Sequence, residues 1–190
     1  MMKIDELKAL LQNKYREFFQ SIEDISRDDQ NNESLCSSPF VCLAFDNAIQ
    51  DLASKKGEDA LKSPDLLHIQ DNQLLFVEFK NGKIDKKERQ SLRLKAIEGP
   101  FIGLYEMIKE HDPSISFHDI VKIDKVYYVV YNEEKNPQKR TAGLQRHLEG
   151  QQIRFSLKKY KGTFMKDVKT ICATVFLESV VSKWKYIHAP

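Results

Sequence analysis

Several features that mark common protein classes are missing from this chain of 190 residues. No apolar run approaches the roughly 18 residues of a membrane span, and the charged start MMKIDELKALLQNKYREFF has no signal-peptide core. The three cysteines, Cys36, Cys42 and Cys172, are odd in number and lack CxxC spacing, which argues against a disulfide framework or a thiolate zinc site. These absences favour a soluble protein of the reducing cytoplasm.

Motifs for several enzyme classes are also missing. The sequence has no Walker loop, no dinucleotide-binding glycine pattern, no HExxH and no G-x-S-x-G. This argues against NTPases, dehydrogenases, zinc proteases and serine hydrolases. The five histidines form no metal-binding spacing, and we expect His68, in the middle of an apolar run, to be a packed core residue.

Charge is distributed unevenly along the chain. Residues 135–190 hold 12 basic and 3 acidic residues, a net charge of +9, although the whole chain carries only +2. Such a segment is typical of a surface that binds a polyanion, and equally of a solvated basic face. The candidates for phosphate contacts are Arg146, Lys158, Lys159 and Lys161.

The order of the elements predicts an α/β fold with a mixed central sheet flanked by helices. We expect one domain over residues 1–190, made of an N-terminal helix and loop (1–33), a core (39–131) and a basic C-terminal part (135–190). The run VKTICATVFLESVVSKW fits either a helix or a strand. The expected helices cover 3–25, 39–55, 84–111 with a break at Gly99-Pro100, and 137–149; the expected strands cover 65–70, 73–80, 122–132 and 152–160.

Charged residues converge at one end of a predicted hairpin. A two-residue turn at Asp71-Asn72 makes the numbers of each cross-strand pair sum to 143, which places Asp65 opposite Glu78. Lys80 shares their face because strand side chains alternate with period two. Two adjacent carboxylates need a shared proton or a cation, and hard oxygen ligands suit Mg²⁺ or Mn²⁺. We therefore expect a divalent metal between Asp65 and Glu78.

The spacing Pro64-Asp65, twelve residues, then Glu78-Phe79-Lys80 resembles the PD-(D/E)XK nuclease superfamily. The helices before and after the hairpin match the order of that core, so the resemblance covers roughly residues 39–131 and implies a restriction-endonuclease-like fold. It implies Asp65 and Glu78 as metal ligands, the Phe79 carbonyl as a further ligand and Lys80 beside the attacking water.

Members of the superfamily also place an acid on the preceding helix, for which Asp46 is the first candidate, ahead of Asp51 and Glu33. A glutamine near the substrate in some subgroups has Gln90 as its counterpart here, without the aromatic that usually accompanies it.

The expected function is thus a Mg²⁺-dependent endonuclease with a restriction, defence, repair or mobile-element role. We expect its substrate to be DNA rather than RNA. Cutting two strands requires two active sites, which favours a homodimer. Two alternatives stay open. One is a catalytically inactive relative that binds nucleic acid or a protein partner, and the other is a protein-interaction subunit that uses the N-terminal helix.

Overall fold

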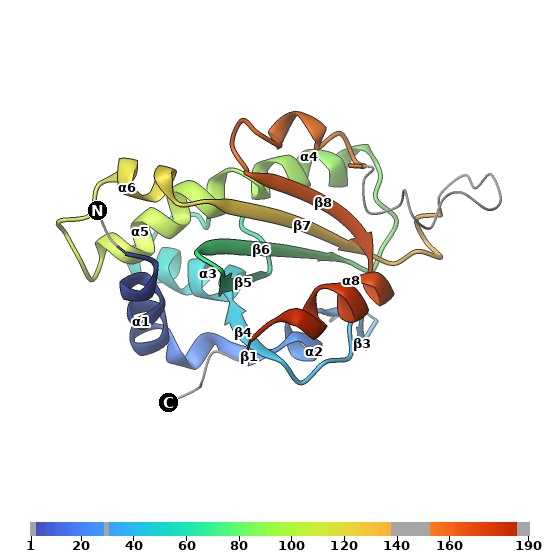
Figure 1. Cartoon of the computed structure of the whole chain (residues 1–190), viewed down its shortest axis with the longest axis horizontal. Coiled ribbons are helices and arrows are strands. Elements are labelled where there is room, and N and C mark those ends of the chain that lie inside the picture. Colours follow the sequence, from blue (N-terminus) through green and yellow to red (C-terminus); the bar gives the residue numbers. More distant parts are fainter. Residues whose placement is uncertain (1–2, 29–30, 138–152, 186–190) are drawn as a thin grey trace.

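The computed structural model describes residues 3–28, 31–137 and 153–185. Within these residues the chain forms an α/β fold around a mixed six-stranded sheet with the order β1-β4-β5-β6-β7-β8 (Figure 1). Strands β1 to β6 pair antiparallel along this order, whereas β7 runs parallel to β6 and β8 parallel to β7. The strands of this sheet are β1 (Phe19–Ser21), β4 (Val41–Ala44), β5 (Leu66–Gln70), β6 (Gln73–Lys80), β7 (Lys125–Tyr131) and β8 (Asp167–Cys172).

The hairpin of β5 and β6 has the predicted register. Leu66 pairs with Val77 and Gln70 with Gln73, so each pair sums to 143. Asp71 and Asn72 both have positive φ, 50° and 59°, as a two-residue hairpin turn requires. Asparagine and aspartate tolerate this conformation, which explains why the turn forms without glycine.

One face of the sheet carries the larger hydrophobic core. Leu67, Leu74 and Phe76 point to this face and pack against helices that precede and follow the hairpin. Figure 1 shows these helices behind and beside the strands. They are α1 (Ile4–Lys14), α3 (Phe45–Lys56), α4 (Lys86–Lys95), the π-helical turn η2 (Glu98–Gly103), α5 (Leu104–Lys109) and α6 (Phe117–Lys122).

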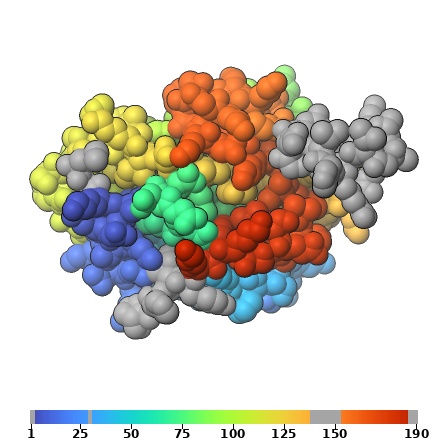
Figure 2. Space-filling view, in the orientation of Figure 1, coloured from blue at the N-terminus to red at the C-terminus, as the bar shows by residue number. Residues whose placement is uncertain are grey.

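The other face packs against C-terminal elements. Phe176 on α8 (Ala173–Ser179) and Trp184 just after η4 (Val181–Lys183) join a second core with Leu66, Val77 and Val130. In Figure 2 the red residues of this segment form a band across the visible face, next to the green residues near the β5–β6 turn. The amide of Lys185 donates to the Gln70 side chain at 3.2 Å, and this hydrogen bond connects the C-terminal segment to the hairpin.

His68 is buried in this second core, as expected. Its ring stacks on Trp184 with a centroid distance of 4.4 Å. The Nδ1 atom lies 4.0 Å from the Cys42 sulfur. Burial lowers the pKa of His68 to about 4, so the ring is neutral in the folded protein.

The prediction of one helix over residues 3–25 was wrong. Helix α1 ends at Lys14, followed by the 3-10 turn η1 (Arg16–Phe18), strand β1 and the short helix α2 (Ile22–Ile25). Phe19–Ser21 pair with β4 at the edge of the sheet, so strand pairing overrides the three-four spacing of the apolar residues. The predicted loop at 26–34 contains the strands β2 (Arg27–Asp28) and β3 (Glu33–Ser34), which pair with each other.

The helix predicted over 39–55 was half correct. Residues Val41–Ala44 form β4, and the helix begins only at Phe45 without a side-chain cap. Ser38, just before the predicted helix, accepts from the Phe40 amide at 3.3 Å and caps no helix. Because β4 pairs with β1 on one side and β5 on the other, the sheet decides where this helix can begin.

Three predictions concern the later part of the chain. The break at Gly99-Pro100 is confirmed by η2 between α4 and α5, and the strand at 122–132 by β7. The strand at 152–160 was wrong, because the described residues 153–160 contain turns and the 3-10 turn η3 (Lys158–Tyr160). Phe155 and Ser156 have positive φ, which a strand cannot accommodate. The ambiguous run divides into β8 and α8, while the helix predicted at 137–149 lies almost entirely outside the described residues.

Across the described ranges, none of the helices combines the length and the apolar character needed to cross a membrane.

Candidate active site

Two acids meet at the open end of the hairpin, where the register predicted them. Asp65 directly precedes β5, and Glu78 is the third residue from the end of β6, opposite Asp65 if the pairing continues by one residue. Their oxygens converge on one atom. The Nζ of Lys95 lies 3.3 Å from Asp65 Oδ1 and 2.9 Å from Glu78 Oε2.

Lys95, from the last turn of α4, was not a predicted site residue. Its side chain is 14% exposed, against 1% for Glu78, so the three groups form a largely desolvated ionic cluster. Glu88 and Lys95 are seven residues apart and thus lie on one face of the helix. This spacing in the sequence could have identified Glu88 and Lys95 as site residues.

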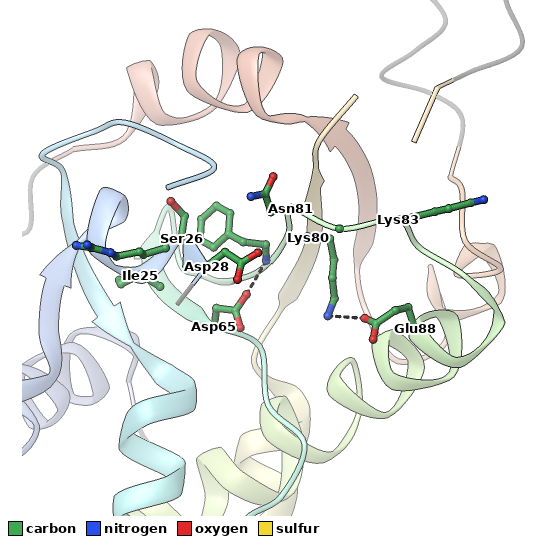
Figure 3. A pocket seen from close by; sticks show the side chains of 11 residues that line it. Ile25, Ser26, Asp28, Asp65, Lys80, Asn81, Lys83 and Glu88 are labelled. Atoms are coloured by element: carbon green, nitrogen blue, oxygen red, sulfur yellow. Dashed lines mark hydrogen bonds and ion pairs between the residues drawn. The ribbon is translucent and has the colours of Figure 1, made fainter. Parts of the chain in front are cut away.

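Lys80 completes the cluster from the same strand as Glu78. Its Nζ lies 3.1 Å from Glu78 Oε1 and 2.7 Å from Glu88 Oε2. Glu88, in the first turn of α4, was not a predicted site residue. It fixes the Lys80 side chain toward the helix, as Figure 3 shows.

Burial and charge set the protonation of the cluster. Burial, with a further contribution from Asp65, raises the pKa of Glu78 to about 7, and burial also raises the pKa of Asp65. Burial disfavours charge on Lys80 and Lys95, but the adjacent carboxylates outweigh it and raise the pKa of both amines. Both lysines are therefore cations, suited to stabilising negative charge and unsuited to accepting a proton.

The backbone holds Asp65 in a fixed position. Its Oδ2 accepts the Phe79 amide at 2.6 Å, and its carbonyl accepts the Phe45 amide at 2.9 Å. The preceding segment is fixed to η2, because the Gly99 amide donates to the Lys62 carbonyl at 2.9 Å. The orientation of the Asp65 carboxylate therefore depends on α3, β6 and η2 together.

Asp46 lies near the cluster but faces other partners. Its Oδ1 accepts the Ser63 hydroxyl at 2.5 Å and its Oδ2 accepts the Gln50 amide at 2.6 Å. The charge of Asp46 contributes to the raised pKa values of Asp65 and Lys95. The predicted acid of the helix thus borders the site, with both oxygens engaged in hydrogen bonds.

The Phe79 carbonyl faces the side of β6 on which Asp65 lies. The Lys80 carbonyl accepts the Asn132 amide, on the β7 side. Backbone groups alternate along a strand, so those of Phe79 face the β5 side, where its amide meets Asp65. By register the residue opposite Phe79 is Pro64, which has no N–H to donate to this carbonyl.

The cluster opens into two pockets that share Ile25, Arg27 and Asp65. The larger, of about 430 Å³, is also lined by Asp28, Lys80, Lys83 and Glu88. Figure 3 shows the Asp65 and Lys80 side chains in this pocket and Lys83 extending away from them. The smaller, of about 270 Å³, is lined on the other side by Asp24 and Asp46. The larger pocket therefore combines three basic side chains (Arg27, Lys80 and Lys83) with three acidic ones, and the smaller is mainly acidic.

The other predicted site residues that the structure describes lie apart from the cluster. Arg146 is outside the described residues, and Lys158 and Lys159 are exposed at η3. Lys161 pairs with Asp167 at 2.7 Å. Gln90 is exposed on α4 and lines neither pocket.

The oxygen ligands at the cluster fit a hard divalent cation. Asp65 Oδ1 and Glu78 Oε2 already converge on a positive charge, and the buried Glu78 Oε1 lies 3.1 Å from the Lys80 Nζ. In the described parts of the chain, no group of three or more His, Cys, Asp or Glu side chains is placed to hold a metal. Two carboxylates with water and a substrate phosphate are a usual ligand set for Mg²⁺.

Comparisons with known proteins were without a match: no family model, no curated protein and no solved structure resembles the chain significantly.

Proposed function

We propose that the protein is a divalent-metal-dependent phosphodiesterase with a restriction-endonuclease-like core. It is an endonuclease whose substrate is DNA rather than RNA. The observation that carries the proposal is the convergence of Asp65 and Glu78 oxygens on a single cationic position, beside Lys80 and an open pocket. The order of α3, the β5–β6 hairpin, α4 and the parallel strand β7 supports the same core.

The chain's own residues supply most of the proposed chemistry. Asp65, fixed by the Phe79 amide, and Glu78, fixed by two lysines, present oxygens in one direction. Lys80 is held by Glu88 at the wall of the larger pocket, where its charge offsets that of a phosphate. Arg27, at the junction of the two pockets, and Lys83 supply further positive charge along the path of a polyanion.

Asp65, Glu78 and the Phe79 carbonyl would hold Mg²⁺ or Mn²⁺. When bound, such an ion lowers the pKa of a water and neutralises charge on the phosphate. Because Lys80 is a cation in this environment, its role is to orient the water and bind the phosphate rather than to remove a proton.

Cleavage of plasmid DNA and of a structured RNA with Mg²⁺ or Mn²⁺ tests this function. We expect cleavage by the wild type, its loss in EDTA, and a decrease of at least about 100-fold in Asp65→Ala. Asp59→Ala, at an exposed position that lines neither pocket, is the matched control and should cleave normally. Equal cleavage by Asp65→Ala and the wild type would exclude the proposed site.

One observation favours a second candidate, a nucleic-acid-binding module without activity. Lys80 and Lys95 together neutralise both acids, so the cluster is satisfied electrostatically by the chain alone. This candidate predicts binding that weakens with salt and is unchanged by EDTA and by Lys80→Ala. Fluorescence anisotropy with a labelled duplex, run with and without Mn²⁺, separates the two candidates.

A further inference from the structure

The carboxylates of Asp65 and Glu78 repel each other, and one cationic side chain offsets this repulsion. Glu78 is 1% exposed and Asp65 23%, so water screens their repulsion poorly. The Lys95 ammonium donates to both carboxylates. It reaches one oxygen of each, at 3.3 and 2.9 Å.

A divalent ion bridging the acids would need the same two oxygens. Mg²⁺ binds oxygen at about 2.0–2.1 Å, a distance that requires a lone pair aimed at the ion. Asp65 Oδ1 and Glu78 Oε2 direct theirs toward the Lys95 Nζ, and the other Asp65 oxygen is engaged by the Phe79 amide. An ammonium at that point would also repel the incoming ion.

From these contacts we propose that Lys95 is the resident counter-ion of the acid pair: it holds Asp65 and Glu78 together in the metal-free protein, and a divalent ion displaces it. The inference rests on the metal site of the proposed function. It makes Lys95 a positioning residue, which acts through the two acids.

Lys80 is not equivalent to Lys95 in this respect. Lys80 contacts the other Glu78 oxygen and is held by Glu88 at 2.7 Å, so it can stay in place when an ion binds. Lys95 has both of its carboxylate partners at the metal position. Its four-carbon side chain emerges near the C-terminal end of α4, where it can rotate away from the acids.

The test compares Lys95→Met with the wild type in two measurements, calorimetric titration with Mn²⁺ and thermal unfolding in EDTA. We expect Lys95→Met to bind Mn²⁺ at least about tenfold more tightly, because the competing charge is gone, and to unfold at a lower temperature without metal. A purely structural lysine would give a different pattern, in which its loss lowers both stability and affinity.

Two variants serve as controls. Lys95→Arg keeps the charge and should retain the Mn²⁺ affinity of the wild type within about threefold, while Lys87→Met removes an exposed lysine of the same helix and should change neither measurement. Unchanged or weaker Mn²⁺ binding by Lys95→Met overturns the inference, as does an absence of binding by both proteins. Tighter binding by Lys95→Met with no cleavage by the wild type would support the inference while rejecting the nuclease.

Discussion

Gly99 lies directly against Ser63, so closely that a β-carbon on Gly99 would stand 2.7 Å from both the Cα and the Cβ of Ser63. This contact joins the π-helical turn η2 to the segment that leads into β5. Ser63 also donates to Asp46, and Asp65 follows two residues later. The position of the site acid thus depends on a glycine more than thirty residues further along the chain.

Replacing Gly99 by alanine should therefore damage both stability and the site. The new methyl group must displace the backbone at Ser63, and we expect a loss of about 2–4 kcal/mol in the free energy of unfolding, measured by urea denaturation. Gly82→Ala is the control, since a β-carbon there meets nothing within 4 Å. Equal stability of the two variants would show that η2 shifts to accommodate the methyl group at little cost in free energy.

Lys80 and Glu88 should affect cleavage to different degrees. Lys80→Met removes the cation beside Glu78 and should lower kcat by about 100-fold or more. Glu88→Gln removes only the partner that orients Lys80, so a decrease of roughly tenfold is expected. Single-turnover cleavage rates provide the measurement, and an inverted order would mean that Glu88 has the more direct role.

Lys125 should be essential for stability although it lies outside the site. It is 1% exposed, donates to the carbonyls of Ile120 and Ile123 at the end of α6, and lies 4.6 Å from the centre of the Phe101 ring. Lys125→Met leaves two carbonyls without this donor, so we expect a loss of about 2–4 kcal/mol in chemical denaturation. Lys122→Met, on the exposed side of α6, should change stability by less than about 0.5 kcal/mol.

His68 should make the protein less stable in acid. Its pKa is about 4 in the folded protein and 6.5 in an unperturbed histidine, so between these values the unfolded chain binds more protons. The neutral His68 ring therefore contributes up to roughly 3 kcal/mol to the free energy of unfolding above pH 6.5. This contribution is lost as the pH falls toward 4.

The variant His68→Phe removes this titration and keeps a ring against Trp184. Denaturation at pH 7 and pH 4.5, followed through the fluorescence of Trp184, the single tryptophan, should show a smaller pH dependence in the variant. His118→Phe, at an exposed position, should behave as the wild type does. A pH dependence that His68→Phe leaves intact would assign the acid sensitivity to other groups.

The hairpin was predictable because its information is local. The turn residues Asp71 and Asn72, the length of the two apolar runs and the alternation of side chains determine the register, and the register pairs Asp65 with Glu78. The buried strand β7 was predictable for a similar reason, because its run of aromatic and β-branched residues favours a strand by itself.

Elements that depend on distant partners were mispredicted. Val41–Ala44 and Phe19–Ser21 are strands because each finds the other across the sheet, and neither is long enough to show an alternating pattern. The composition of residues 153–160 favours a strand. The segment instead forms consecutive turns, from which Phe155 and Tyr160 pack into the larger hydrophobic core.

By itself the sequence determined the α/β class and a pair of acids beside Lys80, since strand pairing over a two-residue turn follows from neighbours in the chain. The tertiary structure was needed to show that Lys95 and Glu88 reach those groups and that Gly99 packs against the segment that leads to Asp65. Those contacts depend on how α4 and η2 lie across the sheet, and packing between distant segments fixes that arrangement.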